Sequence, residues 1–285
     1  MFIKKLLASV ALASLGAVPA HAVGIAGQGT WQQTLLGRDL DGNLSNGPEA
    51  WYDTTLNITW LANTQAIAGT PYDTYFRGGS DDQPYDNESN ETDGRAVLSD
   101  AFFWVQQLNV GGTTGWRLPA TTPIDGSDFR YSPSTKAAGE ADTPWRGVLD
   151  VGWNITSMHS ELAHMFHITL GNLGAYDNDG RLRDPGEISF NTGVFDALKA
   201  RKIWSGSKYH PNERDIAWVF DFASGKQQGG YPALPFPEAY HAWAVHDGDV
   251  GMAMPVPEPA SWAVLLAGLA VVLTSASGWR GARRQ

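Results

Sequence analysis

A charge-free run near the end of the chain, from Pro259 to Trp279, limits the possible folds more than any other feature. A helix needs roughly 20 mostly apolar residues to cross a bilayer, and this run is just long enough. Arg280, Arg283 and Arg284 follow it, and such arginines stay on the cytoplasmic side of a membrane. We therefore expect a transmembrane helix at about 260–279, with the preceding chain outside the cytoplasm. The alternative, a buried core helix, leaves the flanking arginines unexplained.

The first residues predict export as well. Lys4 and Lys5 form a basic segment, residues 6–18 form a short apolar segment, and Ala20-His21-Ala22 is a small-residue cleavage site. This order is typical of a secretory signal peptide, which we place at residues 1–22. A retained N-terminal anchor is the alternative. An ectodomain of residues 23–254 lies between the two targeting segments.

The C-terminal segment, residues 255–285, resembles the PEP-CTERM sorting signal of Gram-negative bacteria. The resemblance rests on Val256-Pro257-Glu258-Pro259, the apolar run behind it, and the arginine-rich end. It implies recognition by an exosortase, which would cleave near the Pro-Glu-Pro motif. It further implies an exported protein that is anchored in the inner membrane before processing and is then found at the cell surface or outside the cell. In that family such tails occur in organisms that produce exopolysaccharide and form biofilms.

The composition of the ectodomain excludes several classes of protein. Without the two targeting segments, 15 basic and 29 acidic residues remain, a net charge near −14. Nucleic acid is therefore an unsuitable partner, since phosphate binding needs clustered lysine and arginine. The chain has no cysteine, which rules out catalytic thiols and thiolate metal sites. Ten tryptophans lie in the ectodomain as core anchors or ligand-stacking surfaces: Trp31, Trp51, Trp60, Trp104, Trp116, Trp145, Trp153, Trp204, Trp218 and Trp243.

Hydrophobic periodicity predicts an α+β domain with long loops. Residues 96–108 have helical spacing, with Asp93 as a possible cap, and so do residues 158–170, with Ser157 as the cap and Gly171 or Gly174 at the end. Polar inserts at 69–94 and 121–150 predict long loops. Short β-branched and aromatic runs predict strands at 31–36, 50–53, 56–61, 202–207, 216–222 and 240–245.

This ordering resembles the DUF1566 family, also called the Lcl C-terminal domain. The more specific motifs are Trp116-Arg117-Leu118-Pro119 and Trp204-Ser205-Gly206; looser matches are 52–61, 217–222 and 242–245. The resemblance implies a C-type-lectin-like fold of short antiparallel strands, two amphipathic helices and long loops. It also implies a bacterial surface location, and sulfated-glycan binding is associated with the family.

The first candidate site is Arg117. Trp116 and Leu118 are expected to fill the core, while Arg117 pairs with a carboxylate or with carbonyl oxygens. A direct ligand contact by Arg117 is the alternative.

A calcium ion is the second candidate, and it would be the only cofactor. Calcium takes roughly 6–8 oxygen ligands, and Asp177, Asp179, Asp184 and Glu187 could supply some of them. The segments 39–43 and 247–249 have a similar acidic pattern. Counting twelve residues from Asp39 reaches Ala50, and from Asp177 it reaches Ile188, so neither loop has the expected glutamate. Ordinary turns capped by aspartate are the alternative.

A third possibility is a metal on one helix face formed by Glu161, His164 and His167, although their spacing departs from the usual zinc motif. No phosphate loop, dinucleotide fingerprint or nucleophile elbow is present in the sequence. We therefore expect a non-enzymatic cell-surface or extracellular-matrix protein that binds glycan, such as exopolysaccharide, or a protein partner. The alternatives are a structural matrix component without a small ligand and a polysaccharide hydrolase acting through two carboxylates.

Overall fold

The computed structural model describes residues 24–73, 93–131, 143–195, 197–198, 201–210, 213–231 and 238–254. The predicted signal peptide, the sorting motif at 256–259, the membrane helix at about 260–279 and the arginines at 280, 283 and 284 lie outside these ranges. Within the described ranges, no helix has the length and apolar character needed to cross a bilayer.

The first of two sheets has five strands from the two ends of the described chain. Its order is β10-β3-β2-β1-β11, and every pairing is antiparallel. The short helix α1 (Trp31–Thr34) leads directly into β1, and the strands are β1 (Leu35–Asp39), β2 (Ala50–Asp53), β3 (Ile58–Leu61), β10 (Val245–Asp247) and β11 (Met252–Ala253). The last strand, β11, thus lies beside the first, β1.

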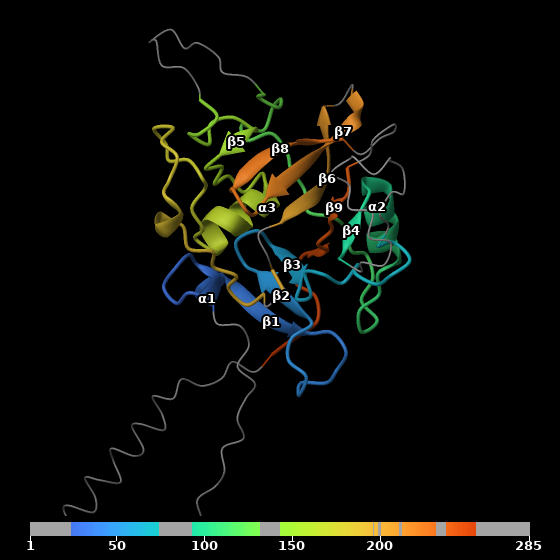
Figure 1. The fold of residues 1–285 in the computed structure, drawn as a ribbon. Coiled ribbons are helices and arrows are strands. Elements are labelled where there is room, and N and C mark those ends of the chain that lie inside the picture. Colours follow the sequence, from blue (N-terminus) through green and yellow to red (C-terminus); the bar gives the residue numbers. More distant parts are fainter. Residues whose placement is uncertain are drawn as a thin grey trace, which may run out of the picture.

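The second sheet has six strands in the order β4-β9-β6-β7-β8-β5. Its centre is the long hairpin of β6 (Lys202–His210) and β7 (Glu213–Asp221), followed by β8 (Lys226–Gly230). The outer strands have two residues each: β4 (Arg95–Ala96), β9 (Tyr240–His241) and β5 (Gly152–Trp153). All pairs are antiparallel except β6 with β9. Figure 1 shows β1, β2 and β3 in blue below the orange strands β6, β7 and β8.

Few helices accompany the sheets in the described part of the chain. The longest is α2 (Leu98–Gln107), and α3 (Glu161–His164) continues as a turn of π-helix, η1 (Met165–Thr169). A turn of 3-10 helix, η2 (Pro185–Glu187), lies in a polar loop. The chain is therefore mostly antiparallel sheet with few helices, which agrees with the coarse α+β prediction.

The core joins the two sheets around Trp243. Residues 242–245 connect β9 in one sheet with β10 in the other, and all four are fully buried. The Trp243 ring centroid lies 4.5 Å from that of Trp60 on β3 and 4.8 Å from that of Phe195. Its indole N–H donates to the Leu61 carbonyl oxygen at 2.8 Å. Trp243, in the connection between the two sheets, thus packs against β3 of the first sheet and against Phe195.

Most predicted elements exist, with shifted ends, but the single strand predicted at 240–245 is wrong: this segment forms β9 and β10, which belong to different sheets. The strand predicted at 50–53 is confirmed, but the one predicted at 31–36 is a helical turn followed by β1. The first helix begins at Leu98 with Val97 as its uncapped N-cap residue, because the Asp93 carboxylate accepts the Arg95 N–H instead. The predicted start of the second helix was wrong. The Ser160 side chain, rather than that of Ser157, accepts the Ala163 N–H, and the helix begins at Glu161, so Met158 lies outside it.

The sequence signal for β8 was missing because this strand is polar and ends in two glycines. The residues of β8 form a strand because every one of them pairs with a residue of β7. A Cβ on Gly230 would lie 2.7 Å from a Val219 methyl carbon, and one on Gly229 would lie 2.7 Å from an Ile216 methyl carbon. Glycine is thus needed here for close packing, although it weakens strands in general.

Candidate functional site

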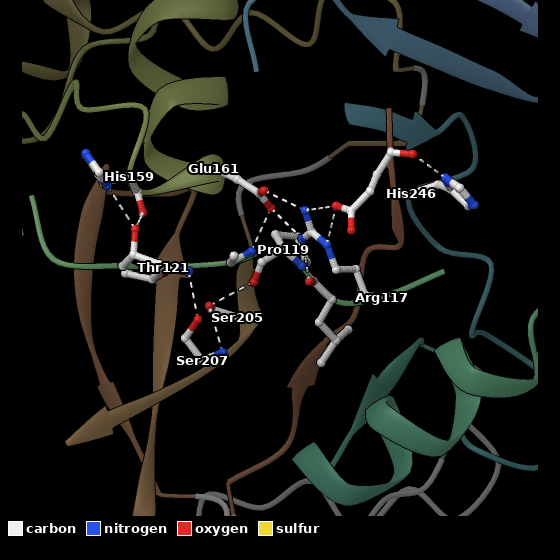
Figure 2. Close-up of polar contacts among 12 residues, drawn as sticks. Arg117, Pro119, Thr121, His159, Glu161, Ser205, Ser207 and His246 are labelled. Carbon is white, nitrogen blue, oxygen red and sulfur yellow. Dashed lines mark hydrogen bonds and ion pairs between the residues drawn. The ribbon is translucent and has the colours of Figure 1, made fainter. Parts of the chain in front are cut away.

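The two specific motifs of the predicted family meet in space. The Pro119 carbonyl oxygen accepts the Gly206 N–H at 2.8 Å and the Ser205 hydroxyl at 2.9 Å (Figure 2). Trp116 and Leu118 are buried, as the sequence predicts, and Arg117 pairs with Val245 of β10 through two backbone hydrogen bonds. The first motif therefore bridges the two sheets, since Val245 and Ser205 belong to different ones.

Arg117 is held by two carboxylates rather than left free for a ligand. Its two terminal nitrogens donate to the two oxygens of Glu161 at 2.8 and 2.7 Å, and its Nε donates to Asp247 at 2.8 Å (Figure 2). Burial by itself would lower the pKa of Arg117, but the hydrogen bonds and charge of Glu161, then of Asp247, outweigh burial and raise it. This arrangement confirms the predicted pairing of Arg117 with a carboxylate.

The two carboxylates differ in exposure, and this difference allows a sharp test. The Glu161 side chain is 12% exposed, whereas that of Asp247 is 78% exposed. Glu161→Ala should destabilise the chain by about 2–4 kcal/mol, because it leaves a partly buried arginine without its bidentate partner. Asp247→Asn should cost less than about 1 kcal/mol, as exposed ion pairs usually do. Urea unfolding of both variants measures the difference, and equal losses would contradict it.

Two of the four carboxylates in the predicted calcium loop, those of Asp177 and Glu187, contact an arginine. The Arg181 Nε donates to Asp177 at 3.1 Å, and its terminal nitrogen contacts Glu187 at 3.0 Å. The second Asp177 oxygen accepts the N–H groups of Asp179 and Arg181. Asp184 contributes its backbone N–H to Glu187. The backbone N–H of Arg181 and, to a smaller extent, its side chain donate hydrogen bonds to Asp177, and these bonds lower the pKa of the Asp177 carboxyl.

The other acidic and histidine patterns have different partners as well. Asp247 binds Arg117, and Asp249 binds Arg38 at 2.5 and 2.9 Å. Glu161 also binds Arg117, while His164 Nδ1 lies 3.3 Å from the Thr156 carbonyl oxygen. The ring of His167 contacts the carbonyl oxygens of residues 172 and 225. These three side chains of the second helix therefore point to separate partners rather than to one metal.

A group of half-buried aromatic side chains, Trp145, Trp153 and Tyr176, forms what we call the aromatic surface. The Trp153 and Tyr176 rings are 4.7 Å apart, and Lys226 Nζ lies 4.9 Å from the Trp153 ring centroid. Gly180 packs against the Trp145 ring, since a Cβ there would lie 2.7 Å from a ring atom. The sequence analysis counted Trp145 and Trp153 among the tryptophans, but it did not single out Tyr176 or place the three residues together.

The backbone under the aromatic surface is fixed by Asn154. Its side-chain amide donates to the Trp145 carbonyl oxygen at 2.7 Å and to that of Tyr176 at 2.9 Å. Asn154 has a φ of 60°, in the left-handed region that non-glycine residues adopt rarely. A Cβ on Gly147 would lie 2.0 Å from the Asn154 carbonyl oxygen. The segments around Trp145 and Tyr176, which lie 9 and 22 residues from Asn154, are thus held side by side next to the edge strand β5.

No protein-family model, curated protein or solved structure matches this chain. The two family resemblances therefore remain predictions, and the functional argument depends on the geometry described above.

Proposed function

We propose that this chain is an exported, non-enzymatic cell-surface or extracellular-matrix protein that binds polysaccharide through the aromatic surface. The observation that carries the proposal is the pair of Trp153 and Tyr176, half-buried at a sheet edge with Lys226 above the indole ring. Such a group offers a rigid apolar face with a polar rim, the usual composition of a small-molecule or sugar subsite. The polar groups next to it are Lys226, over the Trp153 ring, and the loop at 177–187, which directly follows Tyr176.

The finer fold and the destination of the chain belong to the same proposal. A C-type-lectin-like arrangement is supported by two sheets in which every strand except β6 and β7 is short, by one ten-residue helix and by long loops. Export and sorting by an exosortase are supported by the signal-peptide pattern and the tail motif in the sequence. Replacement of Arg280, Arg283 and Arg284 by glutamine should impair retention or processing of the chain in fractionated cells. Unchanged sorting would remove the tail from the proposal.

Polysaccharide binding is tested with the full-length protein, purified in detergent, on immobilised exopolysaccharides. Tyr176→Ala and Trp153→Ala should each weaken retention about tenfold, the equivalent of roughly 1.4 kcal/mol of lost stacking. Tyr231→Ala is the matched control, because Tyr231 is 57% exposed at the opposite end of β8. Circular dichroism verifies that each variant is folded.

The same experiment separates the proposal from its alternatives. Equal retention of Tyr176→Ala and Tyr231→Ala would overturn the role of the aromatic surface. Failure of the wild-type protein to bind any polysaccharide, together with a weakened biofilm on deletion, would instead support a structural matrix component.

A further inference from the structure

The loop between β1 and β2 gathers three carboxylates that no basic side chain in the described ranges pairs with. One oxygen from each of Asp39, Asp41 and Glu49 lies within 4.8 Å of the others. Among the described residues, none of the three forms an ion pair; the neighbouring Arg38 binds Asp249 instead. Calcium binds oxygens at about 2.3–2.6 Å, so oxygens on one ion lie at most about 5 Å apart. The spacing in this loop is compatible with a shared cation.

A second observation is independent of the clustering. The Asp39 side chain is buried, with 1% exposure, and its Oδ2 has no hydrogen-bond partner in the described part of the chain. Its Oδ1, by contrast, accepts the N–H groups of Asp41 and Gly42 at 3.2 and 2.9 Å. A buried charged oxygen without a partner is strongly unfavourable. A bound cation would provide the missing partner in the middle of the acidic group.

The backbone around the three carboxylates is held in place before any ion binds. The Glu49 N–H donates to the Arg38 carbonyl oxygen, and the Leu40 N–H donates to Glu49 Oε2 at 3.0 Å. A Cβ on Gly111 would lie 2.0 Å from the Leu40 carbonyl oxygen. A Cβ on Gly251 would lie 2.7 Å from the Asp39 carbonyl oxygen. Two other segments thus pack directly on this loop, which limits the entropy that ion binding would cost.

The three candidate ligands differ in exposure, so an ion could reach the buried carboxylate from the exposed side. Asp39 is buried, Glu49 is half-buried and Asp41 is exposed. Gly42, with a φ of 81°, turns the chain directly after Asp41. All three ligands are hard oxygens, which favour calcium over softer metals. Water and further oxygens of the loop would complete the coordination from the exposed side.

We propose that the β1–β2 loop binds one calcium ion through the carboxylates of Asp39, Asp41 and Glu49. This site is independent of the proposed polysaccharide binding, because it belongs to the other sheet and lies at the end of the molecule away from β5 (Figure 1). It also differs from the loop at 177–187, where Arg181 pairs with the carboxylates of Asp177 and Glu187.

Calcium alone is the probe, added to the full-length protein in detergent after treatment with a chelator. Extracellular modules bind calcium with a Kd of about 10⁻⁴–10⁻³ M, so about 10 mM Ca²⁺ should raise the Tm by roughly 3–10 °C. Mg²⁺ should give a smaller rise, because it demands shorter bonds and a stricter octahedron. Asp41→Asn should weaken the calcium affinity about tenfold or more, measured by calorimetry.

Asp179→Asn is the matched control, since Asp179 is also an exposed aspartate directly before a turn glycine. It should respond to calcium like the wild type. Glu49→Gln gives a second reading at a side chain whose amide oxygen still accepts the Leu40 N–H. The proposal is overturned if calcium leaves the wild-type Tm unchanged, if Mg²⁺ acts equally, or if Asp41→Asn binds calcium as tightly as Asp179→Asn.

Discussion

Trp243→Ala should lower the free energy of unfolding by about 3–5 kcal/mol, which is the usual range for a large aromatic residue removed from a core. The cavity would open between Trp60, Phe195 and Phe222, whose ring centroids lie 4.5, 4.8 and 6.4 Å from that of Trp243. The Leu61 carbonyl oxygen would also lose its indole donor. Urea unfolding followed by near- and far-ultraviolet circular dichroism measures the loss.

Two controls separate the cavity from the lost hydrogen bond. Trp243→Phe retains most of the ring packing and should cost less than Trp243→Ala, because only the donor to Leu61 and part of the volume are removed. Tyr231→Ala, at a side chain that is 57% exposed, should change stability by less than about 0.5 kcal/mol. If Trp243→Ala unfolded at the same urea concentration as Tyr231→Ala, Trp243 would not be the link between the sheets.

Acidification from pH 6.5 to pH 4 should destabilise the chain through its buried histidines, of which His167 and His241 have the largest shifts and His164 also has a pKa lowered by burial. Burial lowers the pKa of His167 to about 4, and burial followed by the charge of Arg201 lowers that of His241 to about 4. In the unfolded chain both take up a proton near pH 6.5. The unfolded state therefore binds more protons in this window, so stability is fully present above pH 6.5 and falls as the pH approaches 4. Each group contributes roughly 3 kcal/mol.

Burial favours the neutral form of both rings, and the groups next to each ring strengthen or weaken that effect. Arg201 Nη1 lies 3.2 Å from His241 Nδ1, an interaction that needs an unprotonated nitrogen, while Asp93 and Arg95 act with opposite signs. His167 faces two carbonyl oxygens, which favour the charged form, and Arg183, which disfavours it. Burial of Asp53 and Asp150 raises the pKa of both carboxyls and opposes the trend, since the folded state then binds protons first.

Single substitutions isolate the histidine contribution. His167→Gln should flatten the dependence of stability on pH between 6.5 and 4, whatever its effect at neutral pH. His159→Gln, at an exposed histidine, is the matched control. Urea unfolding at a series of pH values provides the readout, and an unchanged slope in His167→Gln would show that this ring titrates alike in both states.

Local patterns predicted individual strands well, because alternation and β-branched residues are short-range signals. The strand at 50–53 and the turn after Asp53 needed no information from elsewhere. The pairing of β6 with β9 and of β10 with β3 was beyond such reasoning, since it depends on contacts between distant residues. The polar strand β8 was missed for the same reason: it exists because β7 provides its hydrogen bonds.

For the candidate sites as well, local sequence signals were informative, whereas contacts between distant residues could not be predicted. The sequence indicated that Arg117 pairs with a carboxylate, but Glu161 and Asp247 are 44 and 130 residues away from it. Counting twelve positions from Asp39 reached Ala50 and missed the glutamate. The hairpin register pairs Arg38 with Ala50, which puts Glu49 opposite Asp39. Position across the hairpin, rather than position along the chain, therefore decides which carboxylates meet.

The pairing of β11 with β1 has a mechanical consequence. Tension applied beyond Met254 reaches the folded part first at β11, whose pairing joins Ala253 to Arg38 and Met252 to Asp39. The Met254 N–H adds one bond to the Gly37 carbonyl oxygen, and the next contacts along the chain are the Val250 N–H to Thr59 Oγ1 and the ion pair of Asp249 with Arg38. A chain tethered by its tail would therefore transmit the load to β1. The force at Met252 would act on its pairing partner, the buried Asp39. Under such load, detachment of β11 and loosening of the β1–β2 loop would be one event.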